Sequence, residues 1–406
     1  MKYQETINWM FNQLPMYQNI GASAYKKDLH NTLLLAKRLQ HPEKKIKTIH
    51  IAGTNGKGST SSMLASILQE AGFKVGLYTS PHLKDYRERI KINGKEIPEE
   101  VVVAFIQQHK SFLEDNQLSF FEMTVGLAFD YFAAEKVDFS VIEVGMGGRL
   151  DSTNIITPLV SVITNIGLDH TQFLGNTLTL IAGEKAGIIK TGVPVVIGEY
   201  TDETKEVFIK TAQEKKAPIY FASESEIQSY PTALLGDYQK KNIKTALQTI
   251  TILQSDYQVP ITKVHCEKGL ANVIQNTGLQ GRWQQLRENP LIICDTAHNK
   301  HGLEIVLQQI QKQQYENLHL VLGFVNDKNL DEILPLFPLT AHYYFARPNI
   351  PRGLGAVVVK NKASQYHLTG KEFGSVSEAY QEAQRQAQPN DMIYIGGSTF
   401  VVAEIL

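Results

Sequence analysis

Cysteine, long apolar runs and an excess of charge of either sign are all scarce in this sequence. Cys266 and Cys294 are its two cysteines, too few for a disulfide framework or a zinc site. No apolar run is long enough to cross a bilayer, and the first residues lack the apolar core of a signal peptide. The formal net charge is −1, without long runs of one sign, so a nucleic-acid footprint is not supported. We therefore expect a soluble cytoplasmic protein with neither nucleic-acid nor membrane partners.

The length of the chain predicts two domains. Its 406 residues are too many for one ordinary core, and strand and helix patterns alternate along most of the sequence. We expect an α/β protein whose first domain, residues 1–285, is a P-loop-type, mostly parallel sheet with helices on both faces. A smaller, Rossmann-like α/β domain is expected over residues 286–406.

Residues 46–72 carry the strongest local signal for chemistry. An apolar strand over residues 46–51 leads into the glycine-rich turn GTNGKGS of residues 53–59. A helix is then predicted by apolar residues at three- and four-residue spacing, namely Met63, Leu64, Ile67, Leu68 and Ala71. This order of strand, turn and helix makes an anion site, because the first helical N–H groups and the helix dipole point into the turn.

The same turn has the side chains that phosphate binding needs. Lys57 adds positive charge for terminal phosphates, and Ser59 or Thr60 can supply a hydroxyl to Mg²⁺. The spacing GxxGKGS is two residues shorter than the Walker form GxxxxGK[ST] and has a glycine after the lysine. An ordinary strand–helix turn rich in glycine is the alternative. Three glycines, a lysine and two hydroxyls at one helix start favour phosphate binding.

The other elements follow from periodicity and turn residues. Asn93-Gly94 predicts a hairpin over residues 89–97, and Pro98 opens a helix. Residues 1–45 are expected to be helical, with an apolar face of Leu29, Leu33, Leu34 and Leu39. Further strands are predicted over residues 74–78, 139–144, 159–166, 193–197, 219–221, 291–295, 318–323, 342–346 and 392–395. Further helices are predicted over residues 122–135, 202–216, 237–254, 330–337 and from Ser375.

Glu143 is a second chemical signal. It lies near the end of a buried apolar strand, before a glycine-rich loop that contains Arg149 and Asp151. A buried carboxylate is costly unless a positive group meets it. Mg²⁺ takes carboxylate and hydroxyl oxygens, and parallel-sheet folds keep their sites at the carboxyl ends of strands. We therefore favour a metal ligand, with a salt bridge from Glu143 to Arg149 or to a lysine as the alternative.

His170 and Lys185 gain meaning only within a constellation. His170 follows the strand predicted over residues 159–166, and Lys185 lies on a helix that begins near Thr179. A histidine taken alone is more often packed or on the surface than a ligand, and a lysine on a helix is more often solvated. The spacing along the sequence does not show whether these side chains converge.

Seven motifs stand in order along both predicted domains. They are GTNGKGS at 53–59, TSPHL at 79–83, EVGMGGRLDSTN at 143–154, LDHTQFLG at 168–175, EKAGIIK at 184–190, GRW at 281–283 and DTAHN at 295–299. Together they resemble the bifunctional folylpolyglutamate synthase and dihydrofolate synthase family of the ATP-dependent Mur ligase superfamily. The resemblance runs from about residue 20 to the C-terminus.

The resemblance implies residues for ATP and metal. The ATP phosphates would lie in the glycine turn, formed by Gly53, Thr54, Asn55, Gly56, Lys57, Gly58, Ser59 and Thr60. Asn242, Arg282 and Asp295 match other positions that contact the nucleotide, and Ser80, Glu143 and His170 match those that hold Mg²⁺. Lys185 matches a lysine that is carbamylated in the family. A neutral amine and CO₂ give an anionic carbamate able to face magnesium, and desolvation and nearby positive charge favour the neutral amine.

The resemblance also implies where the other substrates bind. The residues that match the pterin-side pocket are Ser119, Phe120, Phe121, Glu122, Asp151, Ser152 and Thr153. His298 and Ser398 are candidates near the incoming glutamate or the γ-phosphate, and His298 joins Lys57 and Lys185 as a candidate catalytic residue. Thr296 stands where the family often has glycine, and Phe400 where it often has an aromatic hydroxyl. Residues 22–28 match poorly and are not assigned individually.

The implied reaction is a two-step ligation. ATP phosphorylates a free carboxylate of the pterin substrate, and the α-amine of L-glutamate attacks the acyl phosphate to give an amide, ADP and phosphate. The expected partners are therefore ATP, L-glutamate and either dihydropteroate, reduced folates or both. Domain closure is expected to keep the acyl phosphate from water. We expect the protein to be a monomer.

Two other functions are compatible with parts of the sequence. A muramyl-peptide ligase would use the same chemistry, but about 50 residues precede the glycine turn, too few for the extra N-terminal domain expected of those enzymes. A nucleotide-dependent switch or ATPase would need the glycine turn. It would leave the 295–299 motif and the Lys185 constellation without a task.

Overall fold

The computed structural model describes residues 2–15, 28–228 and 230–406. The chain forms two compact units, one made of Met1–Ala233 with Gln239–Leu279 and the other of Leu234–Tyr238 with Gln280–Leu406. The boundary expected between residues 285 and 286 falls inside strand β9 (Gln284–Arg287). This strand pairs with β10 (Leu291–Cys294), so the second unit begins earlier in the chain. Residues 22–27 of the poorly matching segment lie outside the described residues.

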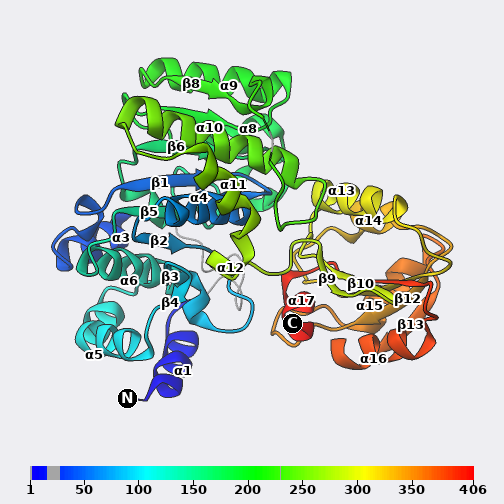
Figure 1. The fold of residues 1–406 in the computed structure, drawn as a ribbon. Coiled ribbons are helices and arrows are strands. Elements are labelled where there is room, and N and C mark those ends of the chain that lie inside the picture. The colour runs from blue at the N-terminus through cyan, green and yellow to red at the C-terminus, as the bar shows by residue number, and fades with distance from the viewer. Residues whose placement is uncertain (1, 16–27, 229) are drawn as a thin grey trace. The chain divides into compact units, whose positions relative to one another are not determined.

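In the described part of the first unit, eight strands form one sheet in the order β4-β3-β2-β5-β1-β6-β7-β8. Neighbouring strands from β2 to β8 run parallel, and β3 and β4 form an antiparallel hairpin at the edge (Figure 1). The predicted hairpin turn is confirmed, because Asn93 and Gly94 have φ of 47° and 74°. The strands are β1 (Thr48–Ala52), β2 (Val75–Tyr78), β3 (Ile90–Ile92), β4 (Lys95–Glu96), β5 (Phe139–Glu143), β6 (Val160–Ile163), β7 (Val195–Ile197) and β8 (Ile219–Phe221).

Helices surround this sheet. Those of the first unit are α1 (Tyr3–Gln13), α3 (His30–Arg38), α4 (Lys57–Glu70), α5 (Glu99–Asp115), α6 (Phe120–Ala134), α7 (Thr171–Leu174), α8 (Leu178–Ala186), α9 (Asp202–Glu214), α10 (Gln239–Tyr257), α11 (Lys263–Ala271) and α12 (Val273–Thr277). Short 3₁₀ helices lie at η2 (Pro42–Lys44), η3 (Tyr86–Arg89), η4 (Ser152–Ile155) and η5 (Ala222–Glu224). The apolar face expected near the N-terminus is wrong in one residue, since Leu33 is 52% exposed and Leu35, Ala36 and Leu39 are buried.

Helix α4, which follows the glycine turn, is buried on all sides rather than on one face. Residues 58–68 are all buried, including four serines and a threonine. The helix packs on β1, β2 and β5 and also against α10, α11 and α12. Gly269 of α11 allows this approach, because a Cβ there would lie 2.5 Å from Ile67 Cα. Ser66 Oγ donates to the Gly269 carbonyl at 2.6 Å, so a small polar side chain is satisfied inside the core.

The second unit has a six-stranded sheet in the order β13-β12-β11-β14-β10-β9, parallel except for β9. Besides β9 and β10 its strands are β11 (Leu318–Leu322), β12 (His342–Ala346), β13 (Gly370–Phe373) and β14 (Met392–Gly396). Its helices are α13 (Lys300–Gln311), α14 (Leu330–Ile333), the 3₁₀ helix η6 (Leu334–Leu336), α15 (Ala356–Ser364), α16 (Val376–Gln386) and α17 (Thr399–Ile405). The predicted fold class, two largely parallel α/β sheets, is confirmed.

Two features that the sequence is expected to lack, disulfides and membrane-spanning helices, can be examined in the described residues. Cys266 and Cys294 are both free and buried, so they form no disulfide with each other. In the part of the chain that the structure describes, no helix is both long and apolar enough to span a membrane.

Candidate functional site

Four neighbouring parallel strands of the first sheet end at the same edge. Their order is β2-β5-β1-β6, and the paired residues Tyr78 with Ile142 and Ile51 with Glu143 fix their register. The segments that leave this edge carry Ser80, Glu143, the glycine turn from Gly53, and His170. The edge therefore brings together four motifs that are as much as 117 residues apart in sequence.

The glycine turn needs its glycines for close approaches. Gly56 is the N-cap residue of α4 with φ of 82°, and a Cβ there would lie 2.3 Å from Asn242 Oδ1. At Gly53, whose φ is 148°, a Cβ would lie 1.8 Å from Thr164 Oγ1. A side chain at either position would have to displace Thr164 or Asn242, because the turn packs directly on the segments that carry these two residues.

The segment after β6 braces the turn. Thr54 Oγ1 donates to the Gly167 carbonyl at 3.1 Å and accepts from the Gly167 N–H at 2.9 Å. The Asn55 N–H donates to Asn165 Oδ1 at 2.9 Å, and Thr164 Oγ1 donates to the Asn55 carbonyl at 2.6 Å. These bonds hold the turn in shape, as a phosphate cradle requires.

Two lysines converge on one carbonyl of this turn. Lys57 Nζ donates to the Gly53 carbonyl at 3.0 Å and to the Thr54 carbonyl at 3.2 Å, and Lys185 Nζ donates to the Gly53 carbonyl at 2.9 Å. Lys185 is 4% exposed, so the alternative of a solvated helix lysine is wrong. Burial, together with the charge of Lys57, lowers the pKa of Lys185 to about 7, while Asp169 and Asp151 oppose the shift.

Glu143 is buried at the end of β5 and accepts a backbone hydrogen bond from the segment after β2. The Ser80 N–H donates to Glu143 Oε2 at 3.3 Å. Arg149 forms an ion pair with Glu184 at 2.8 Å. Arg89 is a positive group whose charge interacts with Glu143. Burial lowers the pKa of the Arg89 guanidinium, and neighbouring negative charges, among them Glu143, oppose this lowering.

The donor set fits a hard divalent cation. A buried carboxylate from Glu143 and the Ser80 segment that contacts it offer oxygen ligands of the kind that Mg²⁺ and Mn²⁺ take. His170, also expected as a ligand, is the left-handed N-cap residue of α7, with φ of 49°. Among the described residues, no group of three or more His, Cys, Asp or Glu side chains is arranged around one point. Any cation at this edge would therefore depend on serine, substrate or water oxygens as well.

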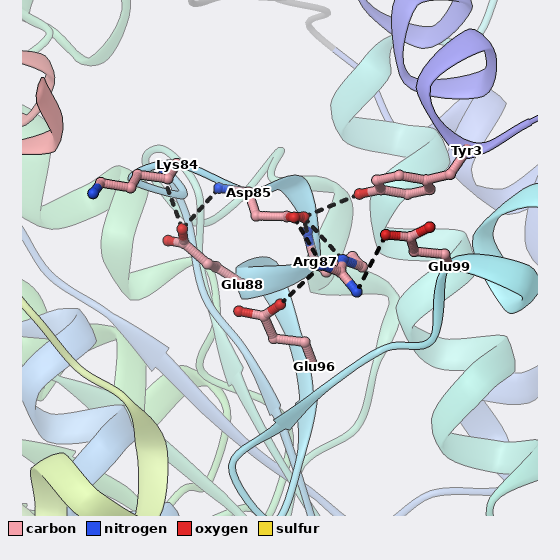
Figure 2. Close-up of polar contacts among 7 residues, drawn as sticks. All are labelled: Tyr3, Lys84, Asp85, Arg87, Glu88, Glu96 and Glu99. Carbon is pink, nitrogen blue, oxygen red and sulfur yellow. Dashed lines mark hydrogen bonds and ion pairs between the residues drawn. The ribbon is translucent and has the colours of Figure 1, made fainter. Parts of the chain in front are cut away.

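Glu88 binds the loop after Ser80 through backbone N–H groups that include those of Lys84 and Asp85 (Figure 2). Its carboxylate accepts backbone N–H groups from Leu83 at 2.7 Å and from Lys84 and Asp85 at 2.8 Å each. Asp85 in turn caps η3 and accepts a hydrogen bond from Tyr3 Oη of α1 at 3.0 Å. The loop that leads away from Ser80 is thus tied both to its own 3₁₀ helix and to the first helix of the chain.

The residues expected on the pterin side have structural tasks of their own. Ser119 is the N-cap residue of α6 and forms a capping box with Glu122, whose Oε2 accepts the Ser119 N–H at 2.7 Å. Phe120 is buried, and Phe121 is partly buried, in contact with the position of Gly145. Binding of a pterin by these residues stays a prediction.

Asp151 shapes the glycine-rich turn after β5. It caps η4: its Oδ1 accepts from the Thr153 N–H at 3.0 Å and from Thr153 Oγ1 at 2.5 Å, and its Oδ2 accepts from the Met146 N–H at 2.9 Å. Burial raises the pKa of Asp151, and these hydrogen bonds oppose the shift. Ser152, the third residue expected here, is buried in the same turn.

His50 is a buried polar residue of this region that the sequence reasoning missed. It lies in the middle of β1, is 0% exposed, and its Nε2 lies 2.8 Å from Thr153 Oγ1. A histidine within the apolar pattern IHIA was the available signal, because burying an imidazole requires a hydrogen-bond partner.

Helix α10 adds a second contact to the glycine turn. Asn242 Nδ2 donates to Gln239 Oε1 at 2.8 Å, and Gln239 Nε2 donates to Ser59 Oγ at 3.2 Å. Asn242, expected to contact the nucleotide, therefore lies beside the turn that is expected to hold the phosphates. Ser59 and Thr60 are both buried, at 1% and 0% exposure.

Three expected residues lie in the second unit: Asp295 and His298 follow β10, and Arg282 lies in the turn before β9. Asp295 Oδ2 accepts from Tyr238 Oη and from the Trp283 N–H, both at 2.6 Å, and burial raises its pKa. Arg282 Nη1 donates to Thr296 Oγ1, so the threonine that departs from the family pattern has a local partner. His298 Nδ1 donates to the Thr296 carbonyl at 2.9 Å.

Ser398 follows β14 and serves as the N-cap residue of α17. Its Oγ accepts from the Phe400 N–H at 3.2 Å, and the side chain is 2% exposed. The strands β10 and β14 are parallel neighbours, so the Asp295 and Ser398 segments leave the same edge of the second sheet. Contacts of either residue with glutamate stay a prediction.

A cavity of about 290 Å³ lies at the opposite edge of the second sheet, away from this chemistry. Its lining includes His319, Lys371, Glu382 and Asp391, near the amino ends of β11, β13 and β14. Asp391 already accepts hydrogen bonds from the Asn317 and Gln388 backbones and from His319, at 2.7–3.2 Å. The Asp391 carboxylate therefore links the segments that lead into β11 and β14.

Comparisons with known proteins match both units. Residues 51–271 match the Mur ligase middle domain, and residues 281–399 match the Mur ligase glutamate ligase domain. The chain is 33% identical to the dihydrofolate synthase/folylpolyglutamate synthase of Bacillus subtilis, over 99% of this chain and 98% of the relative. It is 32% identical to the protein of the same name from Escherichia coli, over 97% of this chain and 94% of the relative.

The solved structures that resemble this one are of proteins of the same kind as the relatives found by sequence. E. coli FolC in complex with DHPP and ADP has a TM-score of 0.87 at 30% identity, covering 100% of this chain and 97% of that one. A bifunctional folylpolyglutamate synthase/dihydrofolate synthase with Mn, AMPPNP and L-glutamate bound has a TM-score of 0.86 at 29% identity, with the same coverage. This chain therefore belongs to the Mur ligase family, in its branch of dihydrofolate synthases and folylpolyglutamate synthases.

Proposed function

We propose that the protein is an ATP-dependent ligase that joins L-glutamate to the carboxylate of dihydropteroate, of reduced folates, or of both. The observation that carries this proposal is the shared edge of β2, β5, β1 and β6. A braced glycine turn and a buried glutamate lie at the ends of adjacent strands there, and Lys57 of α4 and Lys185 of α8 both donate to the glycine turn. Solved relatives hold ADP and DHPP in one case and AMPPNP, Mn and L-glutamate in another.

The reaction takes two steps. A carboxylate oxygen of the pterin substrate attacks the γ-phosphorus of ATP, and the bond to the β,γ-bridging oxygen breaks to give an acyl phosphate and ADP. The α-amine nitrogen of glutamate then attacks the acyl carbon, inorganic phosphate leaves, and the amine loses a proton. Activation is needed because an ionised carboxylate is a poor electrophile.

The chain's own groups position the phosphates and balance their charge. The N–H groups at the start of α4 and the Lys57 ammonium face the turn, and both stabilise charge that builds up on the transferred phosphoryl group. Ser80, Glu143 and His170 are the residues that would hold a divalent cation, which we take to be Mg²⁺. When bound, it would neutralise phosphate charge.

Lys185 is proposed to carry a carbamate. Its neutral amine would attack CO₂, forming an N–C bond and releasing one proton, which turns a buried cation into an anion. The pKa of about 7 supplies neutral amine at physiological pH. Lys185→Ala should lose most activity and recover part of it with added formate or acetate. Labelled bicarbonate should give a carbamate carbon signal in the wild type and none in the variant, and an unlabelled wild type would reject the modification.

The remaining assignments follow the two domains. The first unit, expected over residues 1–285 and found to end at Leu279, is proposed to bind ATP and the pterin, the latter through the Ser119–Glu122 and Asp151–Thr153 segments. The second unit, expected over residues 286–406, is proposed to act on glutamate, with His298 and Ser398 as the candidate contacts. Asn242, Arg282 and Asp295 are proposed to contact the nucleotide, and the protein is proposed to act as a monomer.

One assay tests the proposed function and its two rivals. Purified protein is incubated with ATP, Mg²⁺ and L-glutamate, and with dihydropteroate, tetrahydrofolate or a UDP-muramyl peptide as the acceptor. Both ADP and the glutamylated product are measured, the product by mass. ADP release that requires glutamate and a pterin supports the ligase. ADP release indifferent to both would leave a nucleotide-dependent switch. No product with dihydropteroate would remove the synthase half alone, and product only with a UDP-muramyl peptide would favour the cell-wall ligase.

A further inference from the structure

A continuous buried chain of hydrogen bonds runs from the centre of β1 to the glycine-rich turn after β5. His50 Nε2 lies 2.8 Å from Thr153 Oγ1, and Thr153 Oγ1 lies 2.5 Å from Asp151 Oδ1. The other oxygen of this carboxylate accepts the Met146 N–H at 2.9 Å. Exposure is 0% for His50 and Thr153 and 5% for Asp151, so water does not compete for these bonds.

The proton positions in this chain of hydrogen bonds follow from the Asp151 carboxylate at its end. The Met146 and Thr153 N–H groups donate to Asp151 and favour its ionised form against the effect of burial, and an ionised carboxylate accepts only. The Thr153 hydroxyl then donates to Asp151, and the Thr153 oxygen accepts from His50. The proton of the imidazole therefore lies on Nε2. His50 Nδ1 has no hydrogen-bond partner among the described residues. In this tautomer the unpartnered atom is an acceptor, which costs less to bury than a donor. Burial lowers the pKa of His50 to about 3, so the ring is neutral.

The chain ends where two parts of the proposed site meet. A Cβ on Gly145 would lie 2.4 Å from Phe121 Cζ and 3.2 Å from Asp151 Oδ2, so this turn packs on the proposed pterin side. A Cβ on Gly148 would lie 3.0 Å from the Lys185 carbonyl, and the Arg149 N–H donates to the Glu184 carbonyl at 2.8 Å. A shift of residues 145–151 would therefore reach both the pterin side and the helix of Lys185.

We propose that His50 is a positioning residue for the pterin side of the active site, acting through Thr153 and Asp151 on the turn of residues 145–151. This inference rests on the proposed function. The glycine turn for ATP is braced separately, by the Thr164–Gly167 segment and by α10. Loss of the His50 hydrogen bond should consequently affect the pterin and spare ATP.

His50→Leu and His50→Gln form a matched pair for the test. Leucine fills a similar space with an apolar side chain that cannot donate to Thr153, whereas glutamine can place an N–H near the position of Nε2. We expect the KM for the pterin substrate to rise about five- to tenfold in His50→Leu, the effect of losing one buried hydrogen bond. The KM for ATP should stay within about twofold, and His50→Gln should resemble the wild type.

Two further measurements separate positioning from a general structural role. If His50 acts through Thr153, His50→Leu should add nothing to the pterin KM of Thr153→Val in the double variant. Hydrogen exchange at the Met146 amide should accelerate in His50→Leu, while exchange at the Asn55 amide should not. If His50→Leu does not fold, His50→Asn replaces it, since asparagine places its amide near Nδ1 rather than Nε2.

Each result bears on the inference. An unchanged pterin KM, equal rises of the pterin and ATP KM, or additive effects of the two substitutions would overturn it. Equal pterin KM values for the glutamine variant and for the leucine or asparagine variant would do so too. Wild-type protein that ligates glutamate to neither acceptor would remove the proposed function and this inference with it. An active wild type with any of the overturning results removes the inference alone.

Discussion

At the scale of single residues, the meeting of Lys57 and buried Lys185 at the Gly53 carbonyl explains the chemistry expected of Lys185. Two ammonium groups donate to the same oxygen, and one of them is fully buried. Like charge and desolvation both favour a neutral amine, and together they outweigh the carboxylates Asp169 and Asp151. A lysine with so low a pKa beside a phosphate cradle is typical of a functional rather than a structural residue.

The Lys185 pKa predicts how stability depends on pH. The folded-state pKa of about 7 lies below the ordinary 10.5, so between these values the unfolded chain binds one more proton at this site. The free energy of unfolding contributed by Lys185 therefore rises with pH across this window, and below it the full cost of burying the charge is present. Lys185→Met should lack this rise, and it should be more stable than the wild type near pH 6.

Urea unfolding of both proteins in CO₂-free buffer, where Lys185 is a free amine and not the proposed carbamate, checks this prediction at several pH values between about 6 and 10. The difference between the two free energies isolates Lys185 from other titrating groups. Parallel curves for the wild type and Lys185→Met would show that the lysine titrates normally in the folded protein.

Lys57 offers a second test at the residue scale. Lys57→Ala removes the less buried lysine of the pair and its charge from the phosphate side, so turnover should fall by about 100- to 1000-fold. Lys210→Ala is the matched control, because Lys210 is an exposed lysine on α9, within the same unit. Steady-state ADP release gives both values, and near-normal turnover of Lys57→Ala would reject its phosphate role.

At the scale of elements, the glycine turn and α4 depend on close packing as much as on conformation. Gly56 and Gly72 both have left-handed φ, 82° and 89°, but only Gly56 has another side chain where a Cβ would go. Comparing the two separates the cost of backbone strain from the cost of the close approach to Asn242.

Alanine at these two glycines should therefore have unequal effects. Gly72→Ala should lower the free energy of unfolding by about 1–2 kcal/mol, through strain alone. Gly56→Ala should lower it by about 2–4 kcal/mol and also weaken ADP binding, because Asn242 must move and its hydrogen bond with Gln239 is disturbed. Urea unfolding and ADP titration measure both effects. Equal losses of stability would mean that Asn242 yields freely.

The elements themselves were predictable where pattern and packing agree. Buried parallel strands such as β5 and β12 read as short apolar runs, and Asn93-Gly94 specified its hairpin. The strands β9 and β13 were missed because they are edge strands with the polar sequences QQLR and GKEF. Burial of α4 on every side was not visible in its apolar spacing, since its polar residues are small serines that other helices cover.

The candidate site was predictable as motifs but not as contacts. Adjacent parallel strands place the Ser80, Glu143 and Gly53 segments together, as their positions after strands suggested. No sequence rule gave the bond from Lys185 to Gly53, because it depends on how α8 packs. His50 was missed because a strand histidine carries no motif, and Ser119 with Glu122 read as a substrate segment while they also form a helix cap.

At the scale of the whole molecule, each compact unit has its own hydrophobic core and its own tryptophan. Apolar clusters around Phe129 and Phe208 lie in the first unit, and those around Phe345 and Ile395 lie in the second. Trp9 belongs to the first unit and Trp283, which is 4% exposed, to the second. The sequence has only these two tryptophans, so replacing one of them lets fluorescence report the unit that contains the other.

This arrangement allows a unit-resolved test of nucleotide binding. In Trp283→Phe, emission reports the first unit through Trp9. ADP with Mg²⁺ at about 100 times its Kd should stabilise that unit by about 2.7 kcal/mol and raise the midpoint of its thermal transition, because the glycine turn lies wholly within it. The same scan with Lys57→Ala added should show a smaller shift. A midpoint insensitive to ADP, or a shift unaffected by loss of Lys57, would argue against the glycine turn as the phosphate site.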